Sequence, residues 1–186
     1  MSMKNERTAL VILGNGFEEL EALAPVDLLR RAGVSCRMAS AEPELWVTGR
    51  SGIRVEADVL LSEMTGLVFD ALIIPGGPGT GALRKNSAIL EMVRAQREKG
   101  KMVAAICAAP TVLLEAGVLP GPRHTGHMTV AAELPDMDEG SAVVTDGGVM
   151  TARGAGSALA FGMALVSALA GEEVSNQVGD SIHYGL

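Results

Sequence analysis

The sequence contains few aromatic residues, few cysteines and no long apolar run. Aromatic side chains make up 3% of the 186 residues, so the core must be built from smaller aliphatic side chains, which suits close packing of helices on a sheet. With two cysteines and three histidines in no ligand-like spacing, we expect neither a disulfide framework nor a metal site. No stretch approaches the roughly 20 apolar residues of a membrane span, and the opening residues MSMKNER lack the apolar core of a signal peptide.

Acidic residues outnumber basic ones. The chain carries 22 acidic and 15 basic residues, a formal net charge of -7 and a pI near 5.0. This charge repels phosphate backbones and anionic lipids, which argues against nucleic acid or a membrane as the main partner. We therefore expect a cytoplasmic protein that binds small molecules or other proteins, with one domain spanning residues 1–186.

Strand patterns alternate with helix patterns along the chain. Strands are predicted at 8–13, 34–39, 71–74 and 102–106, hairpins at 45–61 and 142–152, and helices at 18–31, 89–99, 108–116 and 157–170. This order predicts an α/β fold with a mainly parallel sheet and helices on both faces. In such sheets the ligand site lies outside the carboxyl ends of the strands, which here selects Gly14–Phe17, Pro75–Gly79 and Cys107.

Cys107 directly follows the strand expected at 102–106 and opens the next helical pattern. Small residues stand two positions before it, at Ala105, and one and two positions after it, at Ala108 and Ala109. Small neighbours are typical of a nucleophile elbow, in which a strained turn lifts the nucleophile out of the sheet. A thiol at a helix amino terminus has a lowered pKa, so the position predicts a reactive thiolate. The alternative is a buried apolar thiol, which is the state we expect for Cys36.

Glu21 is a candidate partner for this thiol. Glu18 and Glu19 fit the positive end of the expected helix, whereas Glu21 shares its stripe with apolar residues. A desolvated carboxyl tends to stay protonated and can donate a hydrogen bond to a thiolate. The alternative is that all three glutamates simply favour the helix end.

Backbone donors and a histidine complete the set of candidates. The turn containing Gly76 and Gly77 follows a buried strand, so its N–H groups, together with that of Ala108, could form an oxyanion hole. His127 and His124 lie in the loop after the expected helix at 108–116. His127 is the candidate general acid or base, and a merely solvated histidine is the alternative.

Four segments of the chain together resemble the ThiJ/PfpI family. Within it, the similarity is to the parkinsonism-associated deglycase, or glyoxalase III-like, branch and its bacterial members. The segments are ALVILGNGFEELEALAPVDLLRRAG, IIPGGPG, AAICAAP and TDGGVMTARGAGSALAFGMALVSALAG, which are spread along nearly the whole chain. The resemblance implies a flavodoxin-like three-layer sandwich with Cys107 as the nucleophile and Glu21 as the glutamate that hydrogen-bonds it. It also places the family's histidine at His127 and its Gly-Gly turn at Gly76 and Gly77.

The resemblance also implies a homodimer, and it argues against some of the activities found in the family. Asp27, Arg30 and Arg31 fall where the first helix meets the partner in this family. A histidine directly follows the cysteine in the protease-like branch, but Ala108 stands there, which argues against a cysteine peptidase or amidase. Amidotransferase relatives have a glutamate where Thr129 stands, so a Cys-His-Glu triad is not evident.

Two functions remain open at this point. The first is a cofactor-independent glyoxalase or deglycase, in which Cys107 attacks methylglyoxal, glyoxal or their early adducts on amines. The second is a redox-responsive stress protein or chaperone, in which Cys107 is oxidised to the sulfinate. The same carboxyl and amide donors would serve either function.

Overall fold

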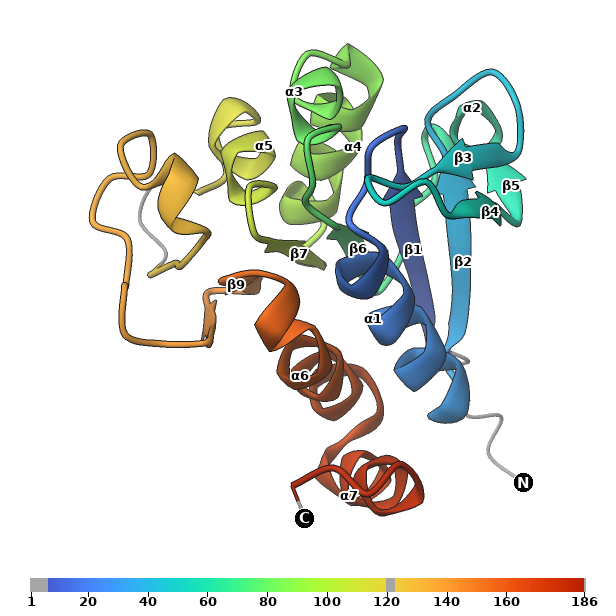
Figure 1. The fold of residues 1–186 in the computed structure, drawn as a ribbon, viewed down its shortest axis with the longest axis vertical. Helices are drawn as coiled ribbons and strands as arrows, with labels where there is room; N and C mark the ends of the chain where they lie inside the picture. The colour runs from blue at the N-terminus through green and yellow to red at the C-terminus, as the bar shows by residue number, and fades with distance from the viewer. Residues whose placement is uncertain (1–6, 120–122, 186) are drawn as a thin grey trace.

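A computed structural model describes residues 7–119 and 123–185, and Figure 1 shows them as one sheet flanked by helices. The strands are β1 (Thr8–Leu13), β2 (Ser35–Ser40), β3 (Trp46–Thr48), β4 (Arg54–Glu56), β5 (Val59–Leu60), β6 (Ala71–Ile74), β7 (Met102–Ile106), β8 (Val143–Asp146) and β9 (Val149–Ala152). The helices are α1 (Glu19–Arg31), α2 (Leu61–Met64), α3 (Thr80–Leu83), α4 (Ser87–Glu98), α5 (Pro110–Glu115), α6 (Ala158–Ala170) and α7 (Glu172–Ser181), with 3-10 turns η1 (Met128–Val130) and η2 (Ala155–Ser157).

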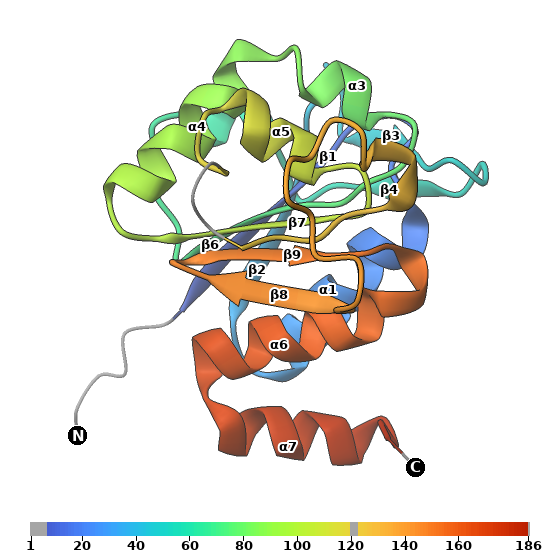
Figure 2. The same ribbon diagram turned by 90° about the vertical axis from the view of Figure 1, so that its left-hand side faces the viewer.

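The sheet has seven strands in the order β5-β2-β1-β6-β7-β9-β8. Neighbouring strands are parallel except β8, which pairs antiparallel with β9 at one edge. The short strands β3 and β4 form a separate antiparallel hairpin. The predicted α/β class, with a mainly parallel sheet and helices on both faces, is confirmed (Figures 1 and 2).

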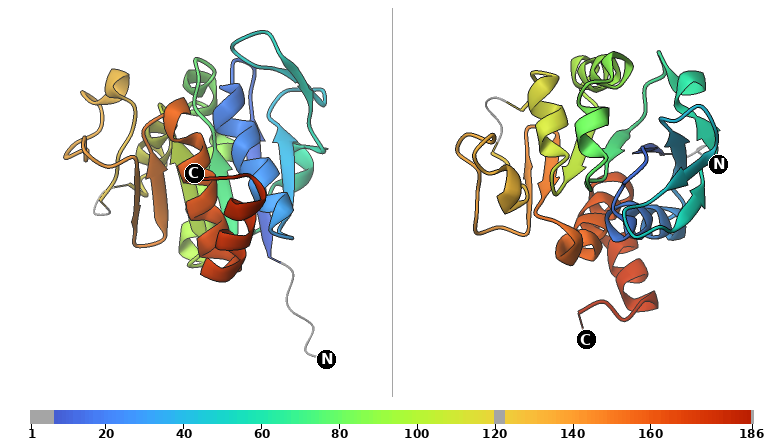
Figure 3. Two further views of the ribbon diagram at one scale, coloured as in Figure 1. Left: turned by 60° about the horizontal axis from the view of Figure 1, so that its bottom comes forward. Right: turned by 45° about the horizontal axis from the view of Figure 1, so that its top comes forward.

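Two apolar cores lie on opposite faces of the sheet. One contains side chains of α1 and α6, which lie side by side, and the other contains side chains of α4 and α5 (Figures 1 and 3). The contact between α1 and α6 depends on Gly162, because a Cβ there would lie 2.6 Å from Cδ1 of Leu28 and 3.3 Å from Cα of Pro25. The scarcity of aromatic residues is therefore compatible with close helix packing.

The observed elements differ from the predicted ones mainly around Cys107 and at the carboxyl end. The helix predicted at 108–116 begins at Pro110, because residues 107–109 form a turn and proline suits the first helical position. The hairpins at 45–61 and 142–152 are confirmed, although Val59–Leu60 joins the main sheet. The sequence prediction missed the short helices α2 and α3 and the longer helix α7.

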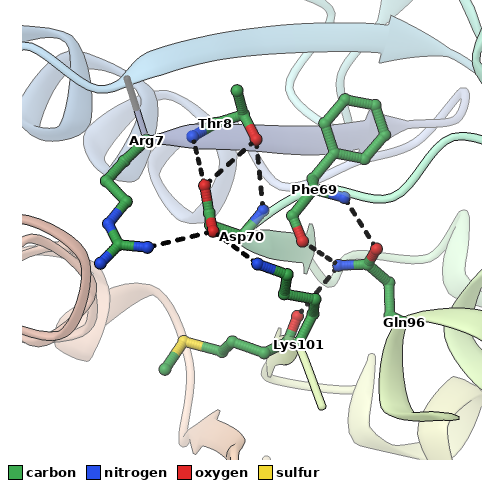
Figure 4. A network of polar contacts seen from close by, with 7 residues as sticks. Arg7, Thr8, Phe69, Asp70, Gln96 and Lys101 are labelled. Carbon is green, nitrogen blue, oxygen red and sulfur yellow. Dashed lines mark hydrogen bonds and ion pairs between the residues drawn. The ribbon is translucent and has the colours of Figure 1, made fainter. Parts of the chain in front are cut away.

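A polar network ties the amino ends of three neighbouring strands together (Figure 4). The Asp70 carboxylate accepts hydrogen bonds from the Thr8 N–H at 3.0 Å and from Lys101 Nζ at 2.9 Å, and it pairs with Arg7 at 3.3 Å. Partial burial acts to raise the pKa of Asp70, but these donors and charges outweigh it and lower that pKa below its ordinary value. This network lies at the opposite end of the strands from Cys107.

Candidate active site

The carboxyl ends of β1, β6, β7 and β9 meet at one edge of the sheet. Because these strands are parallel, the segments that follow them lie together there. The Gly79 N–H donates to the Gly16 carbonyl at 3.2 Å, and the Glu18 N–H donates to the Gly76 carbonyl at 3.0 Å. These bonds join the loops after β1 and β6 beside Cys107.

Cys107 occupies a strained turn at the end of β7. Its φ of 66° lies in the left-handed region, which costs a non-glycine residue about 1–2 kcal/mol. The turn is held from both sides, since the Cys107 N–H donates to the Ala152 carbonyl at 2.9 Å and the His127 N–H donates to the Cys107 carbonyl at 2.8 Å. Cys107 is only partly buried, in contrast to the buried Cys36.

Glu21 lies buried in the first turn of α1 and faces Cys107. Its Oε2 accepts the Gly76 N–H at 2.9 Å, and its carboxyl shares a hydrogen bond with the Cys107 side chain. Burial raises the pKa of Glu21 to about 7, with a further rise from the Glu18 carboxylate that the Cys107 hydrogen bond opposes. A carboxyl with this pKa can gain or lose a proton near neutral pH.

The pKa of Cys107 differs from the sequence prediction. We expected a thiolate at a helix amino terminus, but α5 begins three residues later and is only six residues long. Burial raises the pKa of the Cys107 thiol to about 12, and the neighbouring Glu21 carboxyl adds to this rise. The N–H groups of Ala108 and Gly77 act in the opposite direction. At neutral pH the resting group is therefore a thiol beside a carboxyl that can accept its proton.

The three predicted backbone donors surround this pair but have different partners. The Gly76 N–H is occupied by Glu21, whereas the N–H groups of Gly77 and Ala108 are hydrogen-bonded to the Cys107 sulfur. Gly76 has no room for a side chain, because a Cβ there would lie 2.6 Å from both the Cβ of Cys107 and Oε2 of Glu21. Gly76 thus positions Glu21, and Gly77 and Ala108 contact the sulfur.

His127 lies at the mouth of the site, exposed to solvent. Its Nδ1 accepts the Thr129 N–H at 3.2 Å and lies 2.9 Å from Oγ1 of Thr129. Because Nδ1 is an acceptor here, the proton of the neutral ring is on Nε2. His124 is buried and His183 lies beyond α7. Of the three histidines, His127 is the one that the structure brings beside the residues following β9.

The segment after β9 is a part of the site that the sequence prediction missed. A Cβ on Gly154 would lie 3.3 Å from Cδ2 of His127, 3.7 Å from Oε1 of Glu21 and 4.0 Å from Sγ of Cys107. An open groove of about 500 Å³ runs outward from here between His127 and residues 153–157. The signal was available, since β9 ends at the same sheet edge as β7.

Three further sequence predictions concern parts of the chain outside the active site: the state of Cys36, a metal site and a membrane span. Cys36 is buried in β2, as predicted, and burial raises its pKa to about 12. Within residues 7–119 and 123–185, no group of three or more His, Cys, Asp or Glu side chains is arranged to hold a metal ion. No helix in that same part of the chain is long and apolar enough to cross a membrane.

A model of the DJ-1/PfpI family matches residues 7–168. The chain belongs to the DJ-1/PfpI family.

The relatives that match along most of this chain include proteins of the DJ-1 type. The glutathione-independent glyoxalase DJR-1.2 of Caenorhabditis elegans is 34% identical over 182 residues, which cover 95% of this chain and 96% of the relative. Protein DJ-1 homolog A of Arabidopsis thaliana is 37% identical over 178 residues; the match covers 92% of this chain but only 45% of that longer protein. The structure of oxidized Toxoplasma gondii DJ-1 superposes with a TM-score of 0.93 at 32% identity, covering 97% of this chain and 100% of that one.

Proposed function

We propose that this protein is a cysteine-dependent, cofactor-independent glyoxalase or deglycase. Its substrates would be methylglyoxal, glyoxal or their early adducts on amines. One observation carries the proposal: the partly buried Cys107 side chain is hydrogen-bonded to the Glu21 carboxyl and to the N–H groups of Gly77 and Ala108. The name of the similar DJR-1.2, a glutathione-independent glyoxalase, supports the same chemistry.

In the first step Cys107 attacks the aldehyde carbon of the substrate. The new S–C bond forms as the thiol proton passes to ionised Glu21, whose pKa of about 7 lets it act as a general base near neutral pH. The aldehyde oxygen becomes the oxyanion and then, on protonation, the hydroxyl of a hemithioacetal. The N–H groups of Gly77 and Ala108 would stabilise this oxyanion, while Gly76 holds Glu21 in place.

In the second step the hemithioacetal rearranges and is hydrolysed. Glu21 removes the proton from the former aldehyde carbon and returns it to the adjacent carbon, so the first carbon is oxidised and the second reduced. The product is a thioester of a 2-hydroxy acid, and water cleaves it to lactate or glycolate and regenerates the thiol. No external oxidant or reductant is required, and His127 is positioned at the mouth of the site to assist proton transfer with the water.

A redox-responsive role is the second candidate. Cys107 is only partly buried, and a sulfinate there would be held by the same amide donors and by protonated Glu21. Buried Cys36 offers a matched comparison within the chain. Selective oxidation of Cys107 over Cys36 by mild peroxide, measured by mass spectrometry, would support this role; equal reactivity would contradict it.

We further propose that the protein acts in the cytoplasm as a homodimer. The first helix is the expected contact, and its Asp27 and Arg31 are exposed and paired at 2.8 Å. Arg30 is less available, because it already pairs with Asp58 at 2.6 Å and bonds the Cys36 carbonyl. Sedimentation at several concentrations measures the oligomeric state, and a monomer throughout would contradict the proposal.

The deciding experiment is lactate release from methylglyoxal without glutathione. Wild type and Cys36→Ser are expected to show turnover, whereas Cys107→Ser is expected to show none. Chiral separation of the lactate identifies the face on which the proton is delivered. Full activity in Cys107→Ser, or no activity in wild type, would overturn the enzyme proposal.

A further inference from the structure

The groove between His127 and residues 153–157 contains an arginine, Arg153, that the proposed chemistry does not use. The described residues that line it include His127 and Arg153, and none of them is acidic. The groove begins at Gly154, which is also the residue that approaches Sγ of Cys107 and Oε1 of Glu21.

Arg153 is an arginine without a partner. Its backbone N–H donates to the Ala142 carbonyl, but its guanidinium forms no ion pair or hydrogen bond with any residue of the described ranges. Other arginines of the chain are engaged, as in the pairs of Arg84 with Glu115 and of Arg123 with Asp138. The backbone N–H groups of Ala155 and Gly156, in the same lining, also donate to no acceptor in the described part of the chain.

Arg153, Ala155 and Gly156 line the same groove as Gly154, the residue whose added Cβ would lie 4.0 Å from Sγ of Cys107. A guanidinium and backbone N–H groups match a carboxylate, whose oxygens accept two parallel hydrogen bonds from arginine. Because Gly154 both borders Cys107 and lines the groove, a substrate whose aldehyde is at the sulfur would extend its tail into the groove.

We propose that this groove selects 2-oxoaldehydes that carry a carboxylate on their tail, with Arg153 as the specificity-determining residue. The inference rests on the proposed glyoxalase function and adds a substrate class to it. The chemistry at the reacting carbons is unchanged: such a substrate takes up water and becomes a 2-hydroxy acid, and its tail carboxylate stays intact.

Three 2-oxoaldehydes separate the effect of charge from that of size. Methylglyoxal has no tail, 2-oxopentanal has a neutral tail, and 4,5-dioxopentanoate has a tail of similar length that ends in a carboxylate and gives 2-hydroxyglutarate. The expected wild-type kcat/KM is roughly 10-fold or more higher for 4,5-dioxopentanoate than for 2-oxopentanal, because the charge-assisted hydrogen bonds form only with the carboxylate.

The variants are Arg153→Met, Arg153→Lys and the control Arg37→Met. Arg37 is also exposed and unpaired among the described residues, but it lies in β2 and does not line the groove. The control therefore removes the same positive charge from the protein without changing the groove. Arg153→Met should remove the preference for the carboxylate, Arg153→Lys should retain part of it, and Arg37→Met should keep it. Circular dichroism checks that each variant is folded.

The outcomes distinguish this inference from the proposed function. Turnover of methylglyoxal without any preference for 4,5-dioxopentanoate, or a preference that survives in Arg153→Met, overturns the role of the groove and leaves the enzyme proposal standing. Absence of turnover with all three aldehydes overturns the enzyme proposal itself, and the substrate class falls with it.

Discussion

The backbone N–H of Gly76 donates a 2.9 Å hydrogen bond to Oε2 of Glu21, a residue 55 positions earlier in the chain. The bond fixes the carboxyl of α1 to the turn that follows β6, directly beside Cys107. Glu21 can therefore exchange a proton with the thiol without having to be positioned by the substrate. The geometry of this site depends on a backbone group as much as on side chains.

Gly76→Ala should disturb this relationship. Its Cβ would lie 2.6 Å from both Cβ of Cys107 and Oε2 of Glu21, so overpacking should cost about 1–3 kcal/mol of unfolding free energy and abolish turnover. Gly81→Ala in α3 is the matched control, because nothing lies within 4 Å of its added Cβ. The control should be as stable as wild type or more so in urea denaturation. Equal stability of Gly76→Ala and wild type would contradict the described geometry.

Glu21→Gln should stabilise the protein at alkaline pH while removing its activity. The pKa of Glu21 is about 7 in the folded protein against 4.5 for an ordinary glutamate, so its contribution to stability is present below pH 4.5 and lost as pH rises through about 7. Relative to wild type, Glu21→Gln should gain about 2 kcal/mol at pH 8 and almost nothing at pH 4. Urea denaturation across this range measures the difference. Glu91→Gln, on the exposed side of α4, is the control. If the unfolding free energy of Glu21→Gln followed the same pH dependence as that of wild type, the raised pKa of Glu21 would be refuted.

The positive φ at Cys107 predicts an unusual order of stability between two variants. Cys107→Ala keeps a Cβ in the left-handed region, whereas Cys107→Gly relieves it. Cys107→Gly should therefore be more stable than Cys107→Ala by about 1 kcal/mol, although it buries less surface. Thermal and urea denaturation of the two inactive variants provide the comparison. The reverse order would show that the turn is not strained.

Asp70→Asn should weaken the polar network at the amino ends of the strands. The pKa of Asp70 is lowered in the folded protein, so its stabilising contribution is present above the ordinary value of 3.8 and lost as pH falls through the folded value. The substitution should cost about 1–2 kcal/mol at pH 7, because the salt bridges to Lys101 and Arg7 are partly exposed. The stability cost of Asp70→Asn should become smaller in acid. A cost that did not depend on pH would contradict its attribution to the ionised Asp70 carboxylate. Turnover per folded molecule should not change.

The sheet could largely be predicted from the sequence, because its strands are continuous apolar runs. The observed β1, β6, β7 and β9 have the predicted bounds, since each run ends at glycine, proline or a polar residue. The helix α7 was missed although Val174, Val178 and Ile182 recur at helical spacing, because its remaining residues are polar. The family resemblance inferred from four segments is confirmed.

The site could be predicted as a set of residues but not as a set of protonation states. Sequence position placed Glu21 and Cys107 at one sheet edge, yet it could not show that burial raises both pKa values rather than leaving a thiolate. It also could not show that the Gly76 N–H is occupied by Glu21. These properties depend on distances across the fold, which residue spacing does not contain. The roles of all these residues in turnover stay predictions.

The two edge strands of the main sheet are short, which affects how readily folded molecules aggregate. On one side β5 is two residues long and runs directly into α2, and on the other β8 is only four residues long and folds back on β9. Unpaired strand edges are templates for pairing with another chain, and short edges offer few free N–H and C=O groups. At high concentration, edge-to-edge aggregation of the folded protein through these strands should therefore be disfavoured, even though the interior of the sheet is almost entirely aliphatic.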